Sequence, residues 1–146
     1  MKILKIRPVK TPQRGTPQSA GIDFYVPDNF PKSVISPGHS LNIPSGIHAK
    51  IPEGHVLVLM DKSGVCTKMD LIVGACVVDE DYQGEIHLHV INVGKYCQWI
   101  TPGQKLVQGI LLPVNYATPD VVDSLEELYK GVKTVRGANG FGSTGK

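Results

Sequence analysis

The sequence contains no long uninterrupted apolar segment. Charged residues interrupt the N-terminus, residues 1–7, every few positions, unlike the apolar core of a secretion signal. No other segment approaches the roughly 20 apolar residues that a membrane-spanning helix needs. We therefore expect a cytoplasmic protein, or one in the host cytoplasm if a virus encodes it, without a membrane partner.

Cysteine and excess charge of one sign are also scarce. The three cysteines, Cys66, Cys76 and Cys97, form an odd set without CxxC spacing, which favours free thiols over a disulfide framework. The formal net charge is only +2, so direct binding of nucleic acid is not expected. Neither a P-loop nor a nucleophile elbow occurs, which excludes two common hydrolase sites.

Glycine and proline, by contrast, are frequent, with 16 and 11 copies that separate short apolar or alternating runs. Residues 55–60 form a dense apolar run, and residues 85–92 alternate. One face of the alternating run carries Ile86, Leu88 and Val90. His87 and His89 share the other face, which we interpret as solvated rather than metal-binding because no Cys or His cluster accompanies them. Many short strands bounded by turns indicate an all-β sandwich or barrel.

Only one helical pattern stands out. Residues 119–130 place Val122, Leu125 and Leu128 at three-residue steps. Gly131 follows the run, as is typical of a helix end. The pattern predicts a single short helix.

The composition changes near the C-terminus. Residues 136–146 contain four glycines and a single large apolar side chain, too little to build an element with a buried face. We expect one all-β domain over residues 1–133 and a flexible arm over residues 134–146 that orders only on a partner or ligand. Glycine amides, hydroxyls and the fork of Arg136 would suit a nucleoside polyphosphate, and Phe141 could stack on a flat ring. By itself, the composition favours an ordinary disordered terminus.

Three consecutive acids, Asp79 to Asp81, lie between two valines and a Gln-Gly turn. The pattern predicts a β-hairpin with carboxylates at its bend. An aspartate near a triphosphate, ionised at neutral pH because its ordinary pKa is about 3.9, could orient and deprotonate water. The alternative is an acidic, solvated turn. Residues 62–64, Lys-Ser-Gly, could likewise hold a phosphate or form an ordinary exposed turn.

These segments occur in a fixed order that resembles the trimeric, all-β dUTPase family, whose members carry five short motifs. The matching segments are residues 20–23 (AGID), 61–65 (DKSGV), 76–85 (CVVDEDYQGE), 103–108 (GQKLVQ) and 136–145 (RGANGFGSTG). The resemblance implies a compact β-barrel, jelly-roll-like fold with one short helix and the glycine-rich arm.

The resemblance also implies a role for each matching residue. Asp79 matches the carboxylate that activates the attacking water, and Asp23 matches an acid linked to Mg²⁺ through water. The Tyr82 ring would pack on the deoxyribose and exclude a 2′-hydroxyl, the hairpin backbone around Val78 would read uracil, and Phe141 would cover the base. The full set of implied substrate contacts is Lys62, Ser63, Gly64, Val78, Tyr82, Gln108, Arg136, Phe141, Gly142, Ser143 and Thr144.

The implied reaction is hydrolysis of dUTP to dUMP and pyrophosphate, by water attack on the α-phosphorus with Mg²⁺ as cofactor. Such an enzyme supplies dUMP for thymidylate synthesis and keeps uracil out of DNA. The resemblance implies a homotrimer, with sites between subunits and the arm closing over a neighbour's site.

The sequence departs from the family pattern at two places. Asp61 and Lys62 stand where the family usually has Pro-Arg, and Cys76 stands where it usually has glycine. Two alternatives remain open: a dCTP deaminase-related enzyme on the same fold, and a non-catalytic regulatory binding protein. Asp79 and Tyr82 favour the dUTPase over both.

Overall fold

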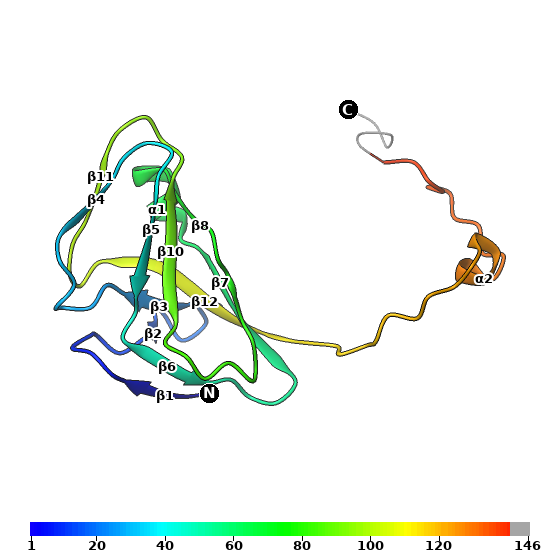
Figure 1. Ribbon diagram of the computed structural model, residues 1–146, viewed down its shortest axis with the longest axis horizontal. Coiled ribbons are helices and arrows are strands. Elements are labelled where there is room, and N and C mark those ends of the chain that lie inside the picture. Colours follow the sequence, from blue (N-terminus) through cyan, green and yellow to red (C-terminus); the bar gives the residue numbers. More distant parts are fainter. Residues whose placement is uncertain (141–146) are drawn as a thin grey trace. The chain divides into compact units, whose positions relative to one another are not determined.

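The structure is a computed structural model, and it describes residues 1–140 (Figure 1). The chain divides into two compact units, Met1–Asn115 and Tyr116–Lys146. The first unit holds the described strands, and the second begins upstream of the predicted arm.

The first unit is built from antiparallel strands in four sheets of the described residues. The strand order is β1-β6, β5-β10-β8, β11-β4 and β2-β3-β12-β7-β9. The strands are β1 (Lys2–Lys5), β2 (Gln13–Arg14), β3 (Ile22–Tyr25), β4 (Ser33–Ile35), β5 (Ser40–Pro44), β6 (Ile47–Lys50), β7 (His55–Asp61), β8 (Leu71–Val73), β9 (Val77–Val78), β10 (His87–Asn92), β11 (Gln98–Ile100) and β12 (Lys105–Pro113). The predicted all-β fold is confirmed.

Strand alternation directs apolar side chains into one core between the sheets. The predicted apolar face of residues 85–92 is confirmed, because Ile86, Leu88 and Val90 are all fully buried. His89 on the opposite face accepts a hydrogen bond from the Ala75 amide through Nδ1 at 3.1 Å. The core therefore lies on the side that the alternation predicts.

The long strand β12 organises the largest sheet, because it pairs with β3 on one side and β7 on the other. Its register places Gln108 directly opposite Asp23 on β3 and Met60 on β7. A register shift between Lys105 and Val107 marks a bulge at the start of the strand. Segments far apart in the sequence thus meet on the three central strands of this sheet.

The described residues contain two short helices, α1 (Ser63–Met69) and α2 (Leu125–Tyr129). The second lies within the predicted helical run, and Ser124 caps it by accepting the Glu127 amide at 3.1 Å. The first was not predicted, because it begins Ser-Gly and lacks a side-chain cap. No helix within residues 1–140 is long and apolar enough to cross a membrane.

Candidate active site

Asp79 opens a tight turn between two different sheets. The turn is closed by the Tyr82 amide, which donates to the Asp79 carbonyl at 3.2 Å, and the Asp79 side chain is exposed. The strand before it, β9, pairs with β7, whereas the strand after it, β10, pairs with β5 and β8. The predicted hairpin is therefore wrong, although the predicted bend of carboxylates is present. Val78 on β9 is buried opposite Leu57.

Tyr82 is held in place by its own loop. Its hydroxyl donates to the Glu85 carbonyl at 3.0 Å, and its ring lies against Gly84. A Cβ atom on Gly84 would lie only 2.9 Å from Tyr82 Cε2, so a side chain there would displace the ring. Because Tyr82 is still 44% exposed, its ring remains accessible to a ligand. The sequence marked Gly84 only as part of a turn, whereas the structure shows that it makes room for the Tyr82 ring.

Glu85 anchors the end of this loop to the rest of the unit. Its carboxylate accepts two bonds from Arg7, through Nε at 2.8 Å and Nη2 at 3.1 Å, and a third from the Gly46 amide at 2.7 Å. The hydrogen bond from Arg7 is the main reason that the pKa of Glu85 lies below its usual range, although partial burial opposes the shift. Nothing in the sequence pattern pointed to this pair.

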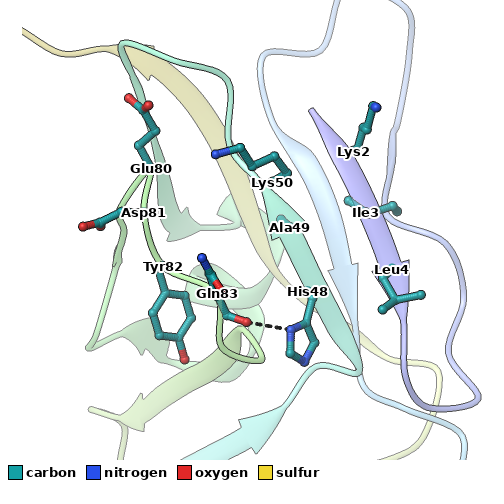
Figure 2. A pocket seen from close by; sticks show the side chains of 10 residues that line it. All are labelled: Lys2, Ile3, Leu4, His48, Ala49, Lys50, Glu80, Asp81, Tyr82 and Gln83. Carbon is teal, nitrogen blue, oxygen red and sulfur yellow. Dashed lines mark hydrogen bonds between the residues drawn. The ribbon is translucent and has the colours of Figure 1, made fainter.

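A cavity of about 460 Å³ separates the loop from the two-stranded sheet of β1 and β6. Figure 2 shows Lys2, Ile3 and Leu4 on one strand, His48, Ala49 and Lys50 on the other, and Glu80, Asp81, Tyr82 and Gln83 on the loop. His48 Nδ1 bonds the Gln83 carbonyl at 2.8 Å, and Glu80 accepts the Gly54 amide at 2.7 Å. The lining includes Tyr82 but not Asp79, so this cavity is distinct from the space in front of the candidate base.

A second cluster forms where β3, β7 and β12 meet. The Asp23 carboxylate, only 7% exposed, forms ion pairs with Lys62 and, at 3.3 Å, with Lys105. Gln108 Nε2 donates to the carbonyl of Asp61 at 2.8 Å. These contacts bring residues of the first, second and fourth motifs together. Lys105 joins this cluster without having been predicted.

Gly21 makes room for the cluster. A Cβ atom at this position would lie 2.7 Å from Gln108 Cδ, so any side chain would displace the Gln108 amide. Ser63 and Gly64, the other residues predicted to contact phosphate, are exposed at the start of α1. They directly follow Lys62 in the chain, and they are therefore next to the cluster.

The structure explains both departures from the family pattern. Asp61 ends β7 and Lys62 directly follows it; the Asp61 carboxylate accepts the Val73 amide at 2.6 Å, whereas the Lys62 ammonium pairs with Asp23. The Asp61 carboxylate is thus hydrogen-bonded to the backbone of β8. Cys76 packs against the hydrophobic core, and its carbonyl accepts the Leu59 amide at 2.7 Å.

Comparison with known proteins shows which family the sequence matches. The dUTPase sequence profile matches residues 7–145. The deoxyuridine 5′-triphosphate nucleotidohydrolase of Maricaulis maris is 38% identical over 141 residues, covering 92% of this chain and 86% of the relative.

The chain belongs to the dUTPase family.

It is thereby a hydrolase, and further relatives agree. The deoxyuridine 5′-triphosphate nucleotidohydrolase of Chlamydia pneumoniae is 38% identical over 136 residues, covering 92% of this chain and 90% of the relative. The solved dUTPase of Staphylococcus bacteriophage 80alpha with dUpNHpp has the same fold. It superposes with a TM-score of 0.86 at 21% identity, covering 99% of this chain and 98% of the phage chain.

Asp23 is the dUTPase residue predicted to face the metal ion. Both of its oxygens already lie near ammonium groups, and the described residues contain no group of three or more His, Cys, Asp or Glu that could hold a metal. The described residues therefore offer Mg²⁺ no preformed set of direct ligands, and the contact of Asp23 through water stays a prediction. Mg²⁺ commonly keeps several of its waters in proteins.

The predicted arm contacts lie in the second unit or beyond the described residues. Arg136 is exposed, and its Nε donates to the Asn139 carbonyl at 3.0 Å. Phe141, Gly142, Ser143 and Thr144 lie outside the described residues. Their roles stay predictions.

Proposed function

We propose that this dUTPase-family chain hydrolyses dUTP to dUMP and pyrophosphate, with Asp79 activating the water that attacks the α-phosphorus. The observation that carries the proposal is an exposed Asp79 in the same turn as a Tyr82 ring fixed by Glu85 and Gly84. An exposed carboxylate can take a proton from water, and the fixed ring can press on a sugar. The products would supply dUMP for thymidylate synthesis, and removal of dUTP would keep uracil out of DNA.

The proposed substrate contacts divide between the two clusters. Tyr82 packs on the deoxyribose and excludes a 2′-hydroxyl, and the backbone around Val78 reads uracil. Lys62, Ser63, Gly64 and Gln108 contact phosphate oxygens. The ion pair between Asp23 and Lys62 supports this division, because it restrains an ammonium group beside the Gln108 amide.

The arm over residues 134–146 is proposed to close the site. Arg136 then holds the terminal phosphate together with hydroxyls of the arm, and an aromatic ring covers uracil. The arm residues in these roles are Arg136, Phe141, Gly142, Ser143 and Thr144. The sites lie between subunits of a proposed homotrimer, and the protein is proposed to be cytoplasmic.

Mg²⁺ is the proposed cofactor. When bound, it neutralises negative charge on the triphosphate and fixes its conformation. Asp23 would hold the ion through water rather than directly, because both of its oxygens are paired with lysines. A variant of the dUTPase from phage phi11 of S. aureus, with a TM-score of 0.75 at 21% identity, coordinates a structural Mg(II) ion.

The test is a hydrolysis panel of dUTP, UTP, dTTP and dCTP, with and without Mg²⁺. We expect pyrophosphate release only from dUTP with Mg²⁺, and a loss of roughly 100- to 10,000-fold in kcat for Asp79→Asn because the base is removed. Similar rates with dUTP and UTP would refute the role of Tyr82. Ammonia from dCTP would instead identify a deaminase, and no turnover at all would identify a binding protein.

A further inference from the structure

We propose that Asp61 is a positioning residue for the phosphate-contacting groups of this site. Asp61 is the last residue of β7, and it touches two other strands. Its carboxylate accepts the Val73 amide of β8 at 2.6 Å, and its carbonyl accepts Gln108 Nε2 of β12 at 2.8 Å. The inference rests on the proposed function, since it assigns Asp61 a task in holding groups that bind the substrate.

The two contacts act on opposite ends of the same residue. The Asp61 backbone pairs with Val107 of β12, the carboxylate bond ties it to β8 as well, and its carbonyl holds the Gln108 amide. Gly21 leaves the space that this amide occupies. Moving the Asp61 backbone would therefore move the Gln108 side chain.

Asp61 also precedes the residues that carry the other proposed phosphate contacts. Lys62 directly follows it and pairs with Asp23, and α1 begins at Ser63. Within α1, the pKa of the Cys66 thiol is raised, first by burial and then by the charge and hydrogen bond of Asp61, which places this carboxylate beside the helix. One side chain thus links β7, β8 and α1 where Lys62, Ser63 and Gly64 leave the sheet.

The physical argument predicts which atoms matter. The bond to Val73 needs an acceptor oxygen at the position of Oδ1, and the negative charge itself is dispensable. Asparagine keeps such an oxygen, and alanine or leucine does not. Asp61→Asn should therefore behave like the wild type, whereas Asp61→Ala should loosen both Gln108 and the start of α1.

The experiment measures binding of two ligands to the full-length chain by calorimetry or competition. The ligands are the non-hydrolysable analogue dUpNHpp, which presents phosphates, and deoxyuridine, which presents none. We expect Asp61→Ala to weaken dUpNHpp binding about five- to tenfold, the range of one lost hydrogen bond, and to leave deoxyuridine binding within about twofold. Asp61→Asn should bind both ligands within about twofold of the wild type.

A control variant, a replacement variant and a hydrogen-exchange measurement complete the experiment. Asp28→Ala removes an exposed aspartate outside the site and should change neither affinity. If Asp61→Ala does not fold, Asp61→Leu removes the acceptor while keeping a side chain of similar shape. Hydrogen exchange at the Val73 amide should speed up in Asp61→Ala and remain slow in Asp61→Asn.

If Asp61→Ala bound dUpNHpp with wild-type affinity, the inference would be overturned. An equal loss of affinity for dUpNHpp and deoxyuridine would also overturn it, because that result indicates a general structural effect. Failure of Asp61→Asn to keep wild-type affinity would also overturn it. A wild-type chain that neither binds dUpNHpp nor hydrolyses dUTP would refute the proposed function first, and Asp61 would then have no substrate group to position.

Discussion

At the scale of single residues, the candidate site depends on a few side chains that hold others. Glu85 ties the loop of Asp79 and Tyr82 to Arg7 and Gly46, and Gly84 leaves room for the tyrosine ring. Gly84 and Glu85 lie in the third motif but had no predicted role, and Arg7 and Gly46 lie outside all five motifs. The residues proposed to touch substrate were predicted through the resemblance, whereas their supports emerged only from contacts.

The Glu85–Arg7 pair leads to a pH prediction. Folding lowers the pKa of the Glu85 carboxyl below its unfolded pKa of about 4.3. The pair therefore stabilises the protein at pH values above the unfolded pKa. This stabilisation is lost as the pH falls through the lower pKa of the folded state. In denaturant unfolding, Glu85→Gln should therefore be less stable than the wild type at pH 7, and the difference should shrink below about pH 4. Glu53→Gln, an exposed acid, serves as the control. A difference that grows at low pH would contradict the pairing.

At the scale of elements, pairing partners were the part that sequence patterns missed. Alternation correctly indicated which face of β10 is buried, but it does not say which strands lie on either side. The valines of β9 pair with β7 and form one edge of the largest sheet. Similarly, α1 is too short and too poor in helix formers to be visible as a periodic pattern.

Gly109, in the middle of β12, tests how tightly these elements pack. A Cβ atom there would lie 2.8 Å from Leu57 Cδ1 and 2.9 Å from Phe24 Cε2, both fully buried. Gly109→Ala should lower the free energy of unfolding by about 1–3 kcal/mol, because the added methyl group would overpack the core. Gly15→Ala, where the added Cβ atom would lie 3.7 Å from Ser19 Oγ, should change it by less than about 0.5 kcal/mol. Equal effects of the two substitutions in urea unfolding would argue against this close packing.

At the scale of the whole molecule, the chain divides into a strand-rich unit and a C-terminal unit that begins at Tyr116. The hydrophobic core lies entirely within the first unit. Arg136 and the proposed arm contacts belong to the second stretch of chain. Folding of the core and closure of the site are therefore expected to be separable.

Truncation before residue 134 tests this separation. The truncated chain should unfold at nearly the same temperature as the full chain, because no core residue is removed. Its kcat/KM for dUTP should fall by roughly 100-fold or more, since positioning groups are lost. Circular dichroism and pyrophosphate release measure the two effects. Full activity after truncation would refute the arm hypothesis, and loss of folding would refute the separation.

The sequence by itself determined the all-β class, the buried face of β10 and the order of the motifs, because these depend on residue type and on spacing over a few positions. Only the tertiary structure decided which distant groups meet. The contacts Lys62–Asp23, Gln108–Asp61 and Arg7–Glu85 span 39, 47 and 78 positions of the chain. Local patterns carry no information about such contacts, because they depend on which strands pair and on how the chain returns to a point that it left many residues before.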